Sequence, residues 1–148
     1  MFELINTYNR VCNKLFADGE MLAFVQFIRN LIEMTVFIYA DNKWLFTIFT
    51  EIYDKQRQFD QIRRNGHRIG LGTLRKEIDT KFGSNLDDLY EKYNAFLHPN
   101  SNQITFGDND DYSFFDDLIT INQTITNILL TQLEQINSKT NNNESDNV

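Results

Sequence analysis

Apolar residues recur at steps of three and four along most of the chain, the spacing that places side chains on one face of an α-helix. The first run covers residues 2–16 and ends near Asp18 and Gly19. The second, residues 20–40, is apolar nearly all round except for a narrow polar wedge of Gln26, Arg29, Asn30 and Glu33. A helix with so little polar surface is expected at the centre of a bundle.

The same spacing continues over residues 44–64, where it predicts a third long helix that ends at the charged pair Arg63 and Arg64. Residues 65–72 contain half of the six glycines and are read as a loop. A short helix with mixed charges is then expected over residues 74–82.

A further helix is predicted to begin at Asn85, a suitable N-cap, and to end at His98. The end is set by Pro99, which disfavours helical geometry in the residue before it. Residues 100–112 are read as an acidic loop, and a last long helix is expected to start near Ser113 and continue through Ile136.

These elements predict an all-α fold, an antiparallel bundle of four long helices plus one short helix, in one domain over residues 1–137. Residues 138–148 are polar and have nothing to bury, so they are expected to form a disordered tail. Neither strand–helix alternation nor an internal repeat is visible in the sequence.

The formal net charge of −7 argues against broad, non-specific attraction to nucleic acid or to anionic membranes. The single cysteine, Cys12, cannot form a disulfide within the chain, and the first residues do not read as a secretory leader. The polar wedge in residues 20–40 disfavours a membrane-spanning helix. The sequence therefore predicts a cytoplasmic protein without membrane association.

Polar residues of two predicted helices offer one candidate cluster. On a helical wheel Asn94 and His98 lie on one line, and Arg29 and Glu33, four residues apart, share a face. If the wedge faces inward, these four residues form a buried polar cluster; if it faces water, they are the solvated edge of a central helix.

Two short motifs carry a resemblance to a known family. The "RNLIE" of residues 29–33, and the late helix that runs from Tyr90 to a terminal "LHP", together resemble the HEPN superfamily (higher eukaryotes and prokaryotes nucleotide-binding). The resemblance implies a helical homodimer linked to nucleic acids or to defence. It also implies that Glu33 orients the catalytic histidine, His98. In ribonuclease members an arginine lies four to six residues before that histidine, whereas here Lys92 is the only cation at this spacing.

Three roles for His98 remain open. A ribonuclease would use it as a general base or acid on the ribose 2′-hydroxyl, with Lys92 or Arg29 holding the phosphate and Asn94 nearby. Alternatively, His98 is a structural residue satisfied by hydrogen bonds at a helix end. The third role is ligand binding without chemistry.

Basic residues gather around the glycine-containing loop. As a set they predict either an anion or RNA phosphate site, or a solvated loop paired with neighbouring acids; they are Arg63, Arg64, His67, Arg68, Arg75 and Lys76. The Asp-rich stretch after Gly107 lacks the residue order of a calcium loop, and the histidines and cysteine lack zinc-ligand spacing. Neither a metal nor a cofactor is therefore expected.

Three functions follow from these readings. The first is a HEPN-like protein that acts by binding RNA, a nucleotide or a protein, without catalysis. The second is a divergent, metal-independent endoribonuclease that uses His98. The third is an acidic inhibitor, encoded by a virus or plasmid, that occupies the basic groove of a protein partner through residues 108–117.

Overall fold

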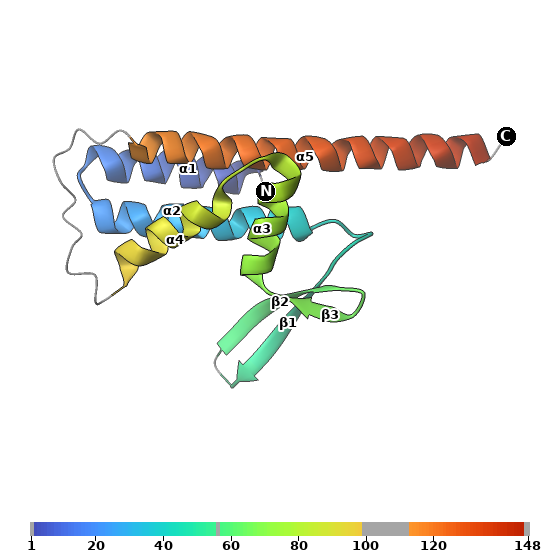
Figure 1. The fold of residues 1–148 in the computed structure, drawn as a ribbon, viewed down its shortest axis with the longest axis horizontal. Coiled ribbons are helices and arrows are strands. Elements are labelled where there is room, and N and C mark those ends of the chain that lie inside the picture. Colours follow the sequence, from blue (N-terminus) through green and yellow to red (C-terminus); the bar gives the residue numbers. More distant parts are fainter. Residues whose placement is uncertain (1, 56, 99–112, 147–148) are drawn as a thin grey trace.

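A computed structural model describes residues 2–55, 57–98 and 113–146, with side chains described as far as residue 143. Figure 1 shows a helical body from which a β-hairpin projects. The elements, in chain order, are α1 (Phe2–Ala17), α2 (Met21–Ala40), β1 (Thr47–Asp54), β2 (Arg57–Arg64), β3 (His67–Ile69), α3 (Leu71–Phe82), α4 (Leu86–Leu97) and α5 (Ser113–Asp146).

Helix α2 is the centre of the helical body, as the sequence predicts. It packs against α1, α4 and α5, and ten of its residues are buried. By length and composition it is also the one helix among the described residues that qualifies as a possible membrane span. Its wholly buried side chains, including Phe24, Ile28 and Ile32, contact other helices of the same chain. Burial in the helical body therefore gives its apolar surface a structural role.

The prediction of a third long helix over residues 44–64 is wrong, and the all-α bundle is wrong with it. These residues form β1 and β2, which pair antiparallel from Thr47 opposite Arg63 to Asp54 opposite Arg57. The short strand β3 adds to β2, giving a sheet in the order β1-β2-β3. The fold is a mixed one, in which five helices accompany a three-stranded antiparallel sheet among the described residues.

Two local features explain why strands form here. Strand β1 reads Thr-Ile-Phe-Thr-Glu-Ile-Tyr-Asp, and six of its eight residues are β-branched or aromatic, types that favour extended backbone. Asn65 and Gly66 both have positive φ, 54° and 79°, and they join β2 to β3 as a two-residue turn. Asn-Gly is the preferred pair for such a turn, because both of its residues tolerate the left-handed region. The apolar spacing of residues 44–64 fits a helix, but these features favour the hairpin.

The base of the hairpin is buried and its far end is exposed. Phe46 and Ile62 belong to the core, at 6% and 1% exposure, whereas Ile52 and Tyr53 near the far turn are 69% and 75% exposed. In Figure 1 the strands accordingly extend away from the helices. The distal half of the hairpin contributes little to the core.

Helices α3 and α4 meet at a shared cap. The carboxylate of Asp79, in α3, accepts the backbone N–H groups of Leu86 (2.7 Å) and Asp87 (3.0 Å) at the start of α4. Asn85, the predicted cap residue, makes no side-chain capping bond. At the other end, α4 stops at Leu97 and His98 is extended, which confirms the predicted helix end.

Helix α5 runs along the body and beyond it, to the right in Figure 1. It begins at Ser113, as predicted, and its helical geometry continues to Asp146, into the segment for which the composition predicts a disordered tail. Residues 138–143 are exposed, but the ammonium of Lys139 lies 3.5 Å from the ring centroid of Trp44. The predicted acidic loop, residues 100–112, lies outside the described residues.

Candidate functional site

The polar wedge of α2 faces α4. Arg29 and Glu33 lie 3.7 Å apart, and the Tyr90 hydroxyl lies 3.3 Å from Nη2 of Arg29 and 3.5 Å from Oε1 of Glu33. All three side chains are half-buried, so the Arg29–Glu33 part of the wedge is neither fully inside nor a solvated edge, whereas Gln26 is exposed. The hydrogen bond to Tyr90 raises the pKa of Arg29 above its ordinary value, and the guanidinium stays charged.

A second arginine completes this polar junction from α3. The guanidinium of Arg75 lies 3.7 Å from the ring centroid of Tyr90, and its Nε donates to the Asp87 carboxylate at 3.0 Å. Its side chain is only 8% exposed. Arg75 therefore fastens α3 to α4, and its burial leaves it unavailable to an incoming phosphate.

The remaining predicted catalytic residues lie along α4. Lys92 donates to Asp117 at 2.6 Å, and Tyr93 donates to the same carboxylate oxygen at 2.7 Å, so the lysine is engaged by α5. Asn94 is half-buried. His98 is exposed at the end of the helix, where its backbone N–H donates to the Ala95 carbonyl at 3.3 Å. A catalytic role for these residues stays a prediction.

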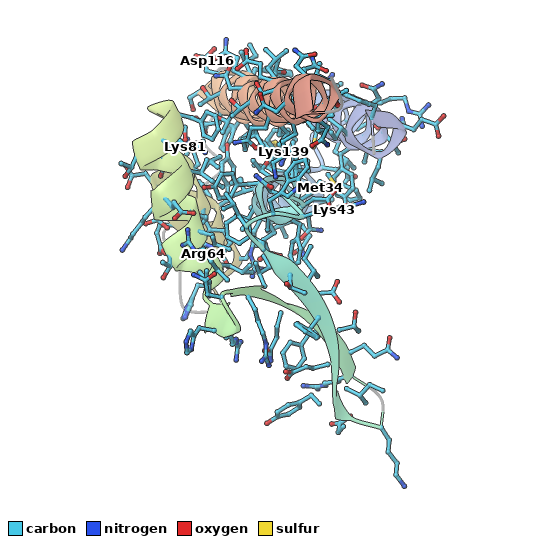
Figure 2. All side chains as sticks on the ribbon, turned by 90° about the vertical axis from the view of Figure 1, so that its right-hand side faces the viewer. Met34, Lys43, Arg64, Lys81, Asp116 and Lys139 are labelled. Atoms are coloured by element: carbon cyan, nitrogen blue, oxygen red, sulfur yellow. The ribbon has the colours of Figure 1, made fainter. Side chains whose placement is uncertain are left out.

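The basic residues predicted as one cluster around residues 63–76 lie in different parts of the structure. Arg64 forms an ion pair with Glu77 of α3 at 2.7 Å, and Tyr39 of α2 donates to the same carboxylate at 2.9 Å. Figure 2 shows Arg64 where the hairpin meets α3. Burial and the bond to Glu77 raise the pKa of Tyr39 to about 12. These contacts hold the hairpin on the helical body.

The exposed members of the predicted cluster are His67, Arg68 and Lys76. Arg68 of β3 lies opposite Arg63 of β2, so both project from the same face of the sheet. His67 lies opposite Arg64 on the other face, and Lys76 lies on α3. Arg63 and Arg68 therefore share one face of the sheet, and the other members of the predicted cluster lie off this face.

The face that carries Arg63 also gathers aromatic side chains. Residues directly opposite in an antiparallel pair share a face, as do alternate residues along a strand. The β1–β2 register therefore places Phe49, Phe59 and Arg57 on the same face as Arg63. An irregularity between Ile52 and Asp54 makes Tyr53 an extra residue, and its ring centroid lies 6.0 Å from that of Phe59. We call this surface the aromatic face; it comprises Phe49, Tyr53, Arg57, Phe59, Arg63 and Arg68.

Contacts within the aromatic face set its geometry. The Arg63 guanidinium lies 5.1 Å from the ring centroid of Phe49, and Glu51 binds it at 3.2 Å while accepting a hydrogen bond from Gln61. Towards the far end is an open hollow of about 650 Å³, lined by Tyr53, Arg57, Gln58, Phe59 and Arg68. The hollow combines the exposed ring of Tyr53 and the half-buried ring of Phe59 with two guanidinium groups.

The hairpin is locally basic in an acidic chain. Residues 47–69 contain five lysines or arginines against three acids, whereas the chain as a whole carries a net charge of −7. The basic residues are Lys55, Arg57, Arg63, Arg64 and Arg68, and the acids are Glu51, Asp54 and Asp60. An anionic ligand is therefore attracted to the hairpin more than to the helices.

Sequence reasoning missed Phe49, Tyr53, Arg57 and Phe59 as site residues, because it placed them on a helix. The Asn65-Gly66 pair was the signal that indicates a hairpin, and a period of two would then have placed these side chains on one face. In the part of the chain that the structure describes, His, Cys, Asp and Glu do not gather in any group of three able to hold a metal ion.

No protein-family model, curated protein or solved structure matches the chain.

Proposed function

We propose that this protein binds single-stranded nucleic acid, RNA in particular, on the aromatic face of its hairpin. The observation that carries the proposal is the alternation on one exposed surface of rings and guanidinium groups. Nucleobases stack on aromatic side chains and on arginine planes, and the phosphates between them need nearby cations. A surface that offers both suits unpaired bases.

The charge distribution supports an anionic ligand at this place. Arg63 and Arg68 lie directly opposite each other on β2 and β3, an arrangement of like charges that is unfavourable in itself. A phosphate between them offsets their repulsion. Glu51 already offsets part of the positive charge of Arg63, so a phosphate would be bound most favourably beside Arg68.

Exposed rings favour single strands over a duplex. Phe49 is 48% exposed and Tyr53 75%, and bases in a duplex are stacked on one another and cannot reach such rings without unpairing. The three arginines of the aromatic face imply few phosphate contacts, so we expect affinity to fall gently with salt. The function is binding, and it requires no catalytic contribution from His98.

Fluorescence anisotropy with a labelled oligouridine of about 12 nucleotides tests the proposal. Phe49→Ala and Tyr53→Ala should each weaken binding about tenfold, the loss expected for one stacked base. Arg68→Ala should weaken it and reduce the salt dependence. Ile52→Ala, on the other face of β1, is the matched control and should bind like the wild type.

Two results would overturn the proposal. One is wild-type affinity in both aromatic variants, with circular dichroism showing that they are folded. The other is equal or tighter binding of the oligonucleotide in duplex form, which would assign the hairpin to a groove of double-stranded nucleic acid instead.

A further inference from the structure

Strand β1 is an open edge of the sheet. It pairs with β2 on one side only, and in the order β1-β2-β3 nothing among the described residues pairs with its other side. Seven of its eight residues are exposed, including Ile48, Phe49, Ile52 and Tyr53. Proteins usually protect such edges with lysine, proline or a covering element, because unpaired backbone N–H and C=O groups recruit another strand.

We propose that β1 pairs antiparallel with β1 of a second copy of this chain, about a twofold axis at Thr50. A twofold axis perpendicular to the sheet keeps each side chain on the same face in both copies. The numbers of two opposite residues then always add up to twice the number of the residue on the axis. With Thr50 on the axis, Ile48 lies opposite the partner's Ile52. Two isoleucine pairs then cover each other on one face.

The neighbouring registers fit less well. With Glu51 on the axis, two carboxylates face each other, which is destabilising. With Phe49 on the axis, Ile52 has no partner, because only residues 47–51 of each β1 overlap. The Thr50 register alone sets Ile48 and Ile52 of the two copies opposite each other, and it places no like charges in opposition. This self-complementarity identifies the occupant as a second copy.

This dimer extends the sheet across both copies and leaves the aromatic faces on the same side. It also shields Ile48 and Ile52, which are 40% and 69% exposed in the single chain. An interface of one strand from each copy is smaller than a standard stable interface, so we expect a dimer that dissociates at low micromolar concentration. The pairing is independent of nucleic acid, and its test contains none.

Oxidative crosslinking tests the register. In Thr50→Cys the two new thiols lie across the axis, where Cα atoms of opposite residues are about 4.5–5.5 Å apart, within disulfide range. In the control Thr47→Cys they lie roughly 20 Å apart, since each is three residues from the axis. The native Cys12 is buried, and burial raises the pKa of its thiol to about 11, so it should not compete. We expect a disulfide dimer from Thr50→Cys alone.

Charge substitution tests the pairing in sedimentation equilibrium. Ile52→Lys should weaken the dimer at least tenfold, because it sets a lysine against the partner's Ile48. The double variant I48E/I52K should restore the dimer, since each new acid faces a new base. Gln58→Lys is the matched control: it adds the same charge on the same face, directly opposite Ile52 but one strand from the edge. It should dimerise normally.

The proposal is overturned if the wild type remains monomeric at high micromolar concentration. It also fails if Thr47→Cys crosslinks as readily as Thr50→Cys, or if Gln58→Lys weakens the dimer as much as Ile52→Lys does. Crosslinking and sedimentation use different variants and report independently. If circular dichroism shows that one variant is unfolded, the other experiment still decides the outcome.

Discussion

Replacing Asp79 by alanine should destabilise the protein more than replacing an exposed acid in the first turn of α4. This carboxylate caps a helix to which it does not belong. Its Oδ1 accepts the N–H of Leu86 at 2.7 Å and the hydroxyl of Ser84 at 2.6 Å, and its Oδ2 accepts the N–H of Asp87 at 3.0 Å. One side chain thus satisfies two of the N–H groups that every helix start leaves unpaired.

The expected loss is about 1–3 kcal/mol. Removing a capping side chain costs about 0.5–2 kcal/mol, and the negative charge beside the positive end of α4 adds about 0.3–1 kcal/mol. Asp79→Asn keeps one accepting oxygen and loses the charge, so about half of that loss is expected. The control is Asp88→Ala: this acid also lies in the first turn of α4 but is exposed, and its loss should be about 0.5 kcal/mol.

Urea unfolding followed by circular dichroism measures these differences, at one protein concentration for all variants. The slope of the free energy with urea should be the same in each, so that a shifted midpoint reports stability alone. If Asp79→Ala is no less stable than Asp88→Ala, water satisfies the start of α4 equally well and the capping argument is wrong.

Three further predictions concern other parts of the fold. The pKa of Tyr39 is raised to about 12, so the neutral hydroxyl adds stability that is complete below about pH 10 and is lost as the pH rises towards 12. In unfolding experiments at stepped pH, Tyr39→Phe should therefore lose about 2 kcal/mol less stability over this range than the wild type. Cys12 should react with a thiol reagent at least a hundredfold more slowly in the native protein than in urea, and equal rates would contradict its burial. Ending the chain at residue 137 removes Lys139 from the Trp44 ring; it should change the fluorescence of this single tryptophan and lower stability by no more than about 1 kcal/mol.

Periodicity predicted the elements whose partners are helices. In α2 the apolar residues face neighbours on nearly every side, so composition alone indicates a central position. The end of α4 followed from the proline after His98, a local steric effect that needs no tertiary information. Both predictions depend on forces that act within one segment, and the structure confirms both.

The hairpin was missed for the converse reason. Ile48, Phe49, Ile52 and Tyr53 have helical spacing, but they are exposed in β1, so their spacing reports no buried face at all. Periodicity locates a core only where apolar residues are buried. The basic cluster shows the same limit of sequence spacing. Arg75 is near the other basic residues in sequence but is buried against Tyr90 and Asp87, and only the fold reveals this separation.

The exposed residues of the hairpin call for an explanation that stability does not provide. Tyr53, at 75% exposure, adds almost nothing to the hydrophobic free energy of folding, since only buried apolar area contributes to it. The hairpin is held by its buried base, where Ile62 enters the core and Arg64 binds Glu77. Its far half is therefore available for a ligand on the aromatic face and for a second copy at the edge of β1. Ile52→Lys separates ligand binding from dimer formation, because it leaves every ring and arginine of the aromatic face in place. If this variant binds RNA as a monomer, the aromatic face functions in a single chain.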